Sequence, residues 1–576
     1  MFNYQEEYIR WRSSPSLSDS EKKELLDIAS DSKEQQFRFY SNMSFGTAGL
    51  RSTMGLGLSL MNKFTVAHTT RGIAKLVKDY GGAKRGVVIA YDSRNNSEYF
   101  AKITASILAS ENVKVYIFDG IRPTPELSFA VRELSAMAGI NITASHNPKE
   151  YNGYKAYWED GSQISPEQAE IVSKARDSFD VLDVSGMCDF DESVGNGKII
   201  ILDNDFDELY ISAVTATAIN SKVICEVSHT LKVVYTPLHG AGYKMVPEVF
   251  RRVGLKHLYT VNDQMDPDGN FPTVLKPNPE YPAVFKLGID IANKVSSDLI
   301  IATDPDSDRV GVMTRNKHGE FIPITGNQMG ALLLDYVINA RKKQGSISKD
   351  SYAVKSLVST DMAYKIADSN NIKLYDVLTG FKFIGEVIKN NESVGNKNGF
   401  LLGFEESYGY LLGSYARDKD AVEASMLILE MTAFYKKENM TLSDALEKLY
   451  ETYGYYSEKT IDIYMEGLDG IEKRRKVMQS LRDNPIHSFG GYRVSKIIDY
   501  KLGRATYPIN MISEEISLPS SDIVYFLLEN DDKIIVRPSG TEPKIKIYIL
   551  AHANNKRELD EKIEKYEIDA KRMTEV

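Results

Sequence analysis

The stretch GVVIAYDSRNNSEYFAKITASILASENVKVYIFDG, residues 86–120, carries the pattern that decides the fold. It begins with a short apolar run, 86–91, that ends at polar residues. The segment 97–110 then has a helical pattern, and a second apolar run follows at 113–118. Apolar runs that alternate with helices predict strands of a parallel sheet in an α/β layer. In such sheets ligands bind at the carboxyl ends of the strands, so we expect functional residues in the loops that follow these runs.

The same pattern of an apolar run followed by a polar loop recurs along the chain. Further examples are AMAGINITASHNP (136–148), LKVVYTPLHGAG (231–242), SDLIIATDPDSDR (297–309) and NGFLLGFEESYGY (398–410). The last part of the chain differs, because alternating stretches such as SDIVYFLLEN and DKIIVRPSG indicate β-rich structure before a charged helix.

We therefore predict an α/β fold with four domains whose loops meet in a central cleft. The 576 residues exceed the roughly 250–300 that a single core holds, which requires several domains. Three similar α/β units are expected at 1–205, 206–322 and 323–450, with the first 40 residues helical. Linker helices and a smaller α+β domain are expected at 451–576.

Composition excludes several classes of function. The formal net charge is −10 and no long Lys/Arg run is present, so a nucleic-acid partner is not expected. Two cysteines, Cys188 and Cys225, are too few for a disulfide framework or a zinc cage and favour reduced thiols in the cytoplasm. The start of the chain has no signal-peptide pattern, and no apolar run approaches the roughly 20 residues of a membrane span.

The sequence DPDSDR at 304–309 is a candidate metal site. Its carboxylates alternate along a turn that leaves the apolar run DLIIAT, so their oxygens can converge on a hard cation such as Mg²⁺. A calcium-binding EF-hand is excluded, because Arg309 and Arg315 stand where that loop needs Gly and Glu. A solvated acidic turn is the alternative. The similar DPDGN at 266–270 follows no comparable apolar strand, and we interpret it as a turn.

Two further loops have the chemistry of a phosphosugar site. In RPSGTEPKIKIY (537–548), a guanidinium, two hydroxyls and the N–H groups of a glycine turn suit a phosphate, although a tight hairpin turn would look the same. In GFEESYG (403–409), carboxylates and a serine suit sugar hydroxyls, and the alternative is an acidic helix N-terminus. Three cations lie beside glycines or acids, and each is compatible with an ordinary surface position: Arg51, Lys382 and Lys419.

The stretch TASHNPKEYNGYK (143–155) places Ser145 beside His146, with Lys155 ten residues further on. The Gly-x-Ser-x-Gly elbow of acyl hydrolases is absent, as is the Walker A phosphate loop. A serine hydroxyl is a poor nucleophile without a base or a metal, and an acidic metal site elsewhere would supply that help for phosphoryl transfer.

These four motifs, in this order and over nearly the whole chain, resemble the α-D-phosphohexomutase superfamily. TASHNPKEYNGYK resembles its phosphoserine loop, DPDSDR its metal loop, GFEESYG its sugar loop and RPSGTEPK its phosphate loop. FGTAGLR near residue 50 and the chain length are most similar to the subgroup of bacterial α-phosphoglucomutases and phosphoglucomutase-2/phosphopentomutases. The resemblance implies mixed sheets in the three α/β units.

The resemblance also implies a role for each matching residue. Ser145 is the residue phosphorylated in the active enzyme, and an oxygen of its phosphate completes the metal site of Asp304, Asp306 and Asp308. Arg51 and Arg309 lie near the transferring phosphoryl group, His146 and Lys155 assist proton movement, and Lys419 is the general acid/base. The sugar hydroxyls bind near Thr379, Lys382, Glu405 and Ser407. The phosphate that does not react binds to Arg537, Ser539, Gly540 and Thr541.

The implied activity is that of a phosphoglucomutase that uses Mg²⁺ and glucose 1,6-bisphosphate, in a monomer or homodimer. Phosphopentomutase is the alternative, and phosphomannomutase is less favoured because GFEESYG differs from the E-x-S-G-H form of dual-specificity enzymes. Pro305 and Ser307 stand where many relatives have small residues, but the carboxylates are intact. Outside this chemistry, a metal-dependent phosphatase and a sugar-phosphate sensor remain open, although a sensor need not keep both the serine and the aspartates.

Overall fold

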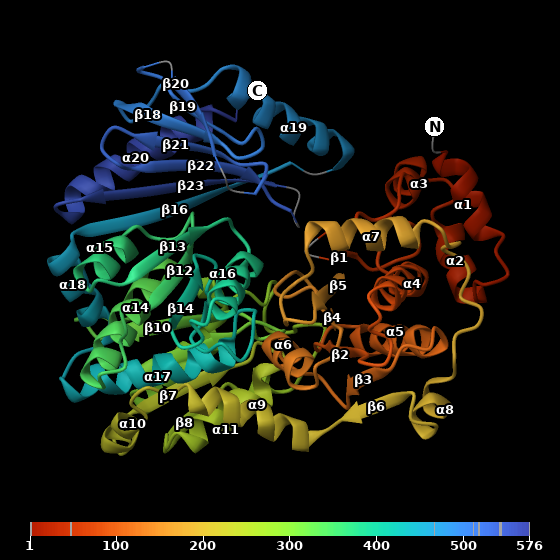
Figure 1. Ribbon diagram of the computed structural model, residues 1–576, viewed down its shortest axis with the longest axis horizontal. Coiled ribbons are helices and arrows are strands. Elements are labelled where there is room, and N and C mark those ends of the chain that lie inside the picture. The colour runs from red at the N-terminus through yellow and green to blue at the C-terminus, as the bar shows by residue number, and fades with distance from the viewer. Residues whose placement is uncertain are drawn as a thin grey trace.

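A computed structural model describes residues 3–46, 49–465, 467–510, 512–516, 519–540 and 544–574 of the chain. Four sheets follow one another along the sequence, and Figure 1 shows the last of them lying over the third.

The first domain begins with the helices α1 (Tyr4–Arg12), α2 (Asp19–Asp27) and α3 (Ser32–Phe39), as predicted for the first 40 residues. Its six-stranded sheet has the order β1–β5–β4–β2–β3–β6. Antiparallel pairs join β1 to β5 and β5 to β4, and the other pairs are parallel. The strands are β1 (Leu50–Thr53), β2 (Val87–Tyr91), β3 (Val115–Phe118), β4 (Ala138–Ile142), β5 (Tyr151–Trp158) and β6 (Ile199–Leu202). The helices are α4 (Lys63–Asp79), α5 (Ser97–Ser110), α6 (Thr124–Glu133), α7 (Pro166–Arg176) and α8 (Phe190–Gly195).

The second domain has a five-stranded mixed sheet of order β11–β10–β9–β7–β8. Its strands are β7 (Lys232–Thr236), β8 (His257–Thr260), β9 (Leu299–Thr303), β10 (Val310–Arg315) and β11 (Phe321–Ile324). Its helices are α9 (Asn204–Ala216), α10 (Lys222–Val227), α11 (Gly242–Arg252), α12 (Asn262–Met265), the 3₁₀ turn η1 (Pro282–Phe285) and α13 (Lys286–Val295). DPDSDR forms the tight connection between the antiparallel strands β9 and β10.

The third domain has a four-stranded sheet of order β13–β12–β14–β15. Its strands are β12 (Tyr352–Ser356), β13 (Lys373–Val377), β14 (Phe400–Glu405) and β15 (Gly409–Leu411). Its helices are α14 (Gly326–Lys343), α15 (Met362–Ser369), α16 (Phe381–Ser393), α17 (Ala421–Lys437) and α18 (Leu442–Tyr453). Helix α17 is buried over most of its length because it packs on α9, α10 and α11 of the second domain as well as on α14.

The fourth domain is a largely antiparallel sheet with two helices. Its strands are β16 (Tyr455–Tyr464), β17 (Ser488–Phe489), β18 (Tyr492–Asp499), β19 (Arg504–Tyr507), β20 (Ile512–Glu515), β21 (Val524–Leu528), β22 (Lys533–Pro538) and β23 (Lys544–Ala553). Its helices are α19 (Gly467–Asp483) and α20 (Lys556–Arg572). We had expected linker helices at its start, but β16 occupies that position and pairs along its whole length with β23. The pairing partner lies about ninety residues further on, so no local pattern reveals it.

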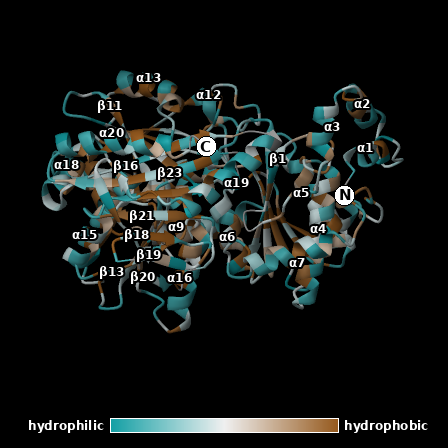
Figure 2. Cartoon of the chain, turned by 90° about the horizontal axis from the view of Figure 1, so that it is seen from above, coloured by the Kyte–Doolittle hydropathy of each residue, from teal (hydrophilic) through white to brown (hydrophobic). Residues whose placement is uncertain are grey.

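The mixed α/β architecture of three similar units and a β-rich fourth is confirmed, whereas the residue limits given for each domain stay predictions. One apolar core runs through the first three domains, with Phe129, Val246 and Leu427 as buried members from each. Figure 2 shows hydrophobic residues concentrated in the strands and hydrophilic residues on the outer helix faces. No helix among the described residues is long and apolar enough to cross a membrane.

Candidate active site

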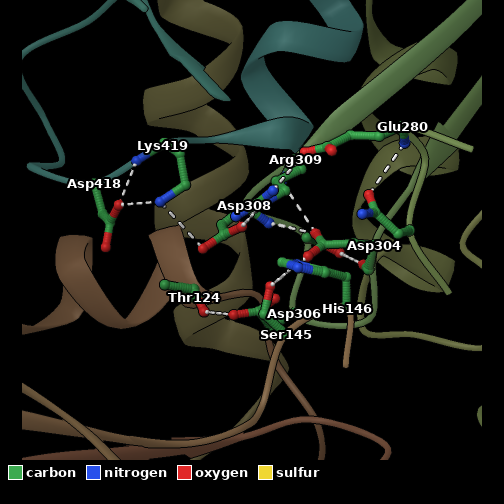
Figure 3. Close-up of polar contacts among 12 residues, drawn as sticks. Thr124, Ser145, His146, Glu280, Asp304, Asp306, Asp308, Arg309, Asp418 and Lys419 are labelled. Atoms are coloured by element: carbon green, nitrogen blue, oxygen red, sulfur yellow. Dashed lines mark hydrogen bonds and ion pairs between the residues drawn. The ribbon is translucent and has the colours of Figure 1, made fainter. Parts of the chain in front are cut away.

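The three aspartates of DPDSDR meet in one buried cluster (Figure 3). Asp304, Asp306 and Asp308 are each at most 2 % exposed, and each offers a carboxylate oxygen within 4.8 Å of the others. The turn holds itself in shape, because Asp304 Oδ1 accepts the backbone N–H groups of Asp308 at 3.1 Å and of Arg309 at 3.0 Å. Ser307, inside the same turn, has a left-handed backbone with φ of +53°.

The donor set fits a divalent cation. Asp306 Oδ1 and Asp308 Oδ1 are buried and find no hydrogen-bond partner among the described residues, which costs free energy unless a cation or another group binds them. Their second oxygens are held in place: Asp306 Oδ2 accepts from Lys155 Nζ at 2.6 Å and from Thr124 Oγ1 at 2.7 Å. Carboxylate oxygens in such a cluster are the ligands that Mg²⁺ prefers.

Charge repulsion inside the cluster appears in the pKa values. Burial raises the pKa of Asp304 well above its usual range, and the charges of Asp306 and Asp308 raise it further. Burial also opposes ionisation of Asp306, but attraction to Lys155, together with the hydrogen bonds from Lys155 and Thr124, lowers the pKa of that carboxyl. Lys155 in turn has a raised pKa, because attraction to Asp306 and Asp308 exceeds the effect of its burial.

Ser145 lies at this cluster although 159 positions separate it from Asp304. It follows β4, within the predicted strand-and-loop stretch 136–148, and it is 2 % exposed. Its Oγ donates to Asp304 Oδ2 at 2.7 Å and lies 3.2 Å from His146 Nδ1. Its φ of +52° is unusual for a residue other than glycine, and such conformations gather at functional sites. Burial, followed by the charges of Arg309 and Arg51, keeps the pKa of His146 well below its usual range.

Arg94 binds the backbone of the loop that carries Ser145, and this role was not predicted from the sequence. Its guanidinium is fully buried and donates to the backbone carbonyl oxygens of Ser145 and Asn147, and to that of Pro148 at 2.8 Å. Asp92 lies 3.4 Å from Arg94 Nε and accepts from the Thr143 hydroxyl at 2.6 Å. One buried ion pair therefore fixes the backbone on both sides of the serine.

The start of α17 brings the third domain to the metal loop. Ala421 N donates to Ser307 O at 3.1 Å. Two residues earlier, Lys419 Nζ lies 3.3 Å from Asp308 Oδ2 and donates to Asp418 Oδ1 at 2.9 Å. Lys419 is therefore not a surface residue, and the attraction of Asp308 and Asp418 raises its pKa against the effect of burial.

The two predicted arginines lie at the edge of the cluster. Arg309 donates through Nη1 to Glu280 Oε1 at 2.7 Å, and its Nε lies 3.8 Å from Asp308 Oδ1. Arg51 comes from β1 and donates to the side-chain oxygen of Asn147 at 3.1 Å. Both guanidinium groups are thus close to the serine and metal loops.

The sugar-loop residues lie at the end of β14 and in the turn that leads to β15. Glu405 is buried and accepts the backbone N–H of Gly380 at 2.7 Å, while Ser407 is half-buried in the turn. Burial is the largest effect on Glu405 and raises its pKa to about 7, although the charge of Lys419 opposes the shift. The carboxyl therefore lies in the same electrostatic environment as the proposed acid/base lysine.

The predicted phosphate loop connects to this region through the third domain. Arg537 Nη1 donates to Thr379 Oγ1, and Thr379 is adjacent to the Gly380 that binds Glu405. Ser539 is half-buried and Gly540 is exposed at the end of β22, whereas Thr541 lies outside the described residues. Lys382 is less well connected: its ammonium lies 4.8 Å from the centre of the Phe383 ring, and burial lowers its pKa.

Several further residues of the site were missed by sequence reasoning. Thr124 at the start of α6 bonds Asp306 and accepts from Asn141 Nδ2 at 2.6 Å. Glu280 holds Arg309, and Asp418 holds Lys419 and accepts from the Tyr157 hydroxyl at 2.9 Å. Asp418 stands beside a predicted residue, but no local signal marks Thr124 or Glu280.

Family models for the Phosphoglucomutase/phosphomannomutase alpha/beta/alpha domains match this chain three times. Domain I matches residues 42–179, domain II residues 208–319 and domain III residues 325–453.

Proteins of similar sequence carry the same family name. A phosphoglucomutase of Staphylococcus saprophyticus is 38% identical over 535 residues, which cover 92% of this chain and 94% of that protein. A phosphoglucomutase of Staphylococcus aureus is 36% identical over 538 residues, covering 92% and 93%.

Solved structures share the fold at lower sequence identity. A phosphoglucomutase/phosphomannomutase family protein of Burkholderia thailandensis has a TM-score of 0.64 at 18% identity, covering 92% of this chain and 98% of the other. The open form of parafusin from Paramecium has a TM-score of 0.66 at 18% identity, covering 92% and 94%. The resemblance inferred from the four motifs is thereby confirmed, and the chain belongs to the phosphoglucomutase/phosphomannomutase family of the α-D-phosphohexomutases.

Proposed function

We propose that this chain is a phosphoglucomutase, which interconverts α-D-glucose 1-phosphate and glucose 6-phosphate through a phosphoserine at Ser145 and a glucose 1,6-bisphosphate intermediate. The observation that carries the proposal is the Ser145 hydroxyl, 2.7 Å from Asp304 in a buried cluster of three carboxylates. The names of the relatives at 36–38% identity support glucose as the sugar.

We assign the metal site to Asp304, Asp306 and Asp308, with a phosphoserine oxygen as a further ligand. The buried oxygens of Asp306 and Asp308 that lack a hydrogen-bond partner support this assignment. When bound there, Mg²⁺ would neutralise charge on the transferring phosphoryl group.

The side chains of the site have different roles in the phosphoryl transfer. In the forward half-reaction the bond between Ser145 Oγ and phosphorus breaks as phosphorus bonds to the free sugar hydroxyl. The hydroxyl loses its proton to a nearby base, for which the neutral His146 is the candidate. The ammonium groups of Lys419 and Lys155, whose pKa values are raised, are the candidates to return a proton to the sugar oxygen that leaves phosphorus in the second half-reaction. In the second half-reaction the other phosphate of the bisphosphate returns to Ser145. The positive charges of Arg51, Arg309 and Lys155 stabilise the charge that spreads over the phosphoryl oxygens.

The far end of the sugar binds to a separate set of groups. We assign its hydroxyls to Glu405 and Ser407, with Thr379 and Lys382 beside them. The non-reacting phosphate binds to Arg537, Ser539, Gly540 and Thr541. The Arg537–Thr379 hydrogen bond supports this division, because it joins the phosphate loop to the sugar loop.

We also propose that the enzyme works in the cytoplasm as a monomer or homodimer. Cys188 and Cys225 are both free thiols, which agrees with a reducing compartment.

Replacement of the serine tests the proposal directly. Ser145→Ala should lower glucose 1-phosphate turnover by about 10³-fold or more with glucose 1,6-bisphosphate supplied, because the phosphate carrier is lost. Ser110→Ala is the matched control: its hydroxyl, on α5, donates to Ile107 O of the same helix at 2.7 Å, and turnover should be unchanged. Intact mass spectrometry should find one added phosphoryl group in the wild type and none in Ser145→Ala.

Two outcomes would reject the assignment. Substantial turnover in Ser145→Ala would remove the phosphoserine, and release of inorganic phosphate without a bisphosphate requirement would indicate a phosphatase. A larger kcat/KM on ribose 1-phosphate than on glucose 1-phosphate would keep the chemistry but replace the substrate by a pentose.

A further inference from the structure

A cavity of about 440 Å³ is lined by residues of α14, α17 and the connection from α9 to α10. Figure 1 shows where these helices lie in the fold. Its walls include Phe434 and Tyr435 near the carboxyl end of α17, while the residues at the serine and metal loops lie at the amino end of that helix. At 1.5 Å per residue, these ends are about 20 Å apart. The cavity is therefore separate from the candidate active site, and its volume lies in the range of small-molecule sites.

The inner wall of the cavity is aromatic. Tyr336 is 3 % exposed, and its ring centre lies 5.6 Å from that of Phe434, which lies 5.2 Å from that of Tyr435. The Tyr336 hydroxyl is already bonded to Glu430 Oε1 at 2.8 Å, so its ring presents an apolar surface. A planar heteroaromatic ring is the ligand group that stacks best on such a wall.

Polar side chains also line the cavity, and they range from half-buried to exposed at its rim. Asp335 is half-buried, and burial raises its pKa. The amides of Asn220 and Asn339 are exposed at the rim, and each offers both a donor and an acceptor.

Lys343 is the cation of the rim. Its ammonium lies 5.0 Å from the centre of the Phe434 ring, and within the described part of the chain it makes no ion pair. A cation held only by a ring face is available to an anion that enters the cavity. Its neighbour Lys342 instead donates to the side chain of Asn370 and does not belong to the residues described as lining the cavity.

We propose that this cavity binds a nucleoside phosphate. The base stacks on the aromatic wall, and the amides of Asn220 and Asn339 bind its edge. The Asp335 carboxylate accepts the ribose hydroxyls, as acidic residues do in dinucleotide sites. The phosphate lies at the rim on Lys343.

Isothermal titration of the full chain with ATP, GTP, CTP and UTP, in excess Mg²⁺, tests this site. At least one nucleotide should bind with a Kd below about 1 mM. Lys343→Ala should weaken that binding about tenfold by removing the phosphate partner, and Phe434→Leu should weaken it by a similar factor because it replaces the stacking ring with an aliphatic group. Lys342→Ala is the matched control and should bind as the wild type does.

The candidate phosphate loop also attracts phosphates, so its contribution must be separated. Arg537→Ala should leave the nucleotide Kd unchanged; a loss of binding in that variant would place the nucleotide in the active site and overturn the proposal. Absence of binding by all four nucleotides would overturn it as well. Inorganic triphosphate that binds as tightly as the nucleotide, with no effect of Phe434→Leu, would show a bare anion site and reject the role of the aromatic wall.

Discussion

The two ends of the candidate active site are built differently. The serine–metal end, formed by Ser145, Lys155 and the three aspartates, is at most 5 % exposed at each residue and joins loops of three domains through one continuous core. The phosphate-loop end, formed by Arg537, Ser539 and Gly540, is half-buried to exposed. Under the proposed reaction this difference has a purpose. Phosphoryl transfer requires fixed atoms in a site without water, whereas a bisphosphate that turns over must first be released at its other end.

The contact between the third and fourth domains also differs from the large core that the first three domains share. It contacts the third domain through a smaller apolar cluster of its own, which includes Leu357 and Val358 on one side and Tyr500 and Ile523 on the other. An ion pair of 2.7 Å between Lys533 and Asp361 crosses the same boundary. Apart from Tyr456 of β16, which packs against the large core, these contacts of the fourth domain lie outside the core that holds the serine and the aspartates.

The largest effect should come from a substitution at the serine–metal end. Asp306→Asn removes one charge of the metal site and takes from Lys155 its 2.6 Å ion pair, while the pair with Asp308 at 3.2 Å remains. Turnover should fall by about 10³-fold, with a large drop in Mn²⁺ affinity measured by isothermal titration as a readout independent of activity.

The look-alike turn at 266–270 supplies the matched control. Asp268 accepts the backbone N–H of Asn270 at 2.8 Å and has no place in the metal cluster. Asp268→Asn should keep both turnover and Mn²⁺ affinity. Unchanged Mn²⁺ affinity in Asp306→Asn would remove Asp306 from the metal site.

A smaller and different effect is expected at the phosphate-loop end. Arg537→Lys keeps the charge but loses the two-pronged guanidinium, so KM for glucose 1-phosphate should rise about tenfold while kcat changes less than about threefold. Arg493→Lys is the control, since Arg493 is exposed on β18 of the same sheet. A fall in kcat with unchanged KM would contradict the contrast, because it would give Arg537 a part in the chemical step.

The positions of three of the predicted loops could be derived from the sequence, because each follows a buried strand. The run DLIIAT forms β9, and its polar continuation lies where the carboxyl ends of the sheets face one another. Ser145 follows β4 for the same reason, so its meeting with Asp304 was predictable although the two are distant in the chain. Strand ends in α/β domains determine position before any side-chain detail is known.

The partners of those residues could not be predicted, since they depend on how distant segments meet. Thr124 contacts Asp306 across a domain boundary, and Arg94 binds carbonyl oxygens whose direction depends on the folded serine loop. The strand β16 was missed because YYSEKTIDIY is exposed or half-buried throughout and gives a weak alternation.

The smallest expected effect is on the pH dependence of the free energy of unfolding, through a carboxyl on the helix that begins at the serine–metal end. Glu423 on α17 is 1 % exposed and accepts the backbone N–H groups of Leu412 and Gly413, and burial, with the charge of Asp420, raises its pKa to about 8. An unfolded glutamate titrates near pH 4.3, so between that value and about pH 8 the folded state holds the extra proton. The contribution of the Glu423 carboxyl to the free energy of unfolding is therefore complete below about pH 4 and is lost as the pH rises through about 8.

Glu423→Gln cannot ionise, so its free energy of unfolding, measured by urea titration, should fall less than that of the wild type between pH 6 and about pH 8.5. Glu438→Gln, at the exposed end of the same helix, should follow the wild type. An equal fall in the free energy of unfolding of the wild type and of Glu423→Gln would contradict this prediction. It would mean that the Glu423 carboxyl is already ionised in the folded protein, as a buried charge beside Asp420.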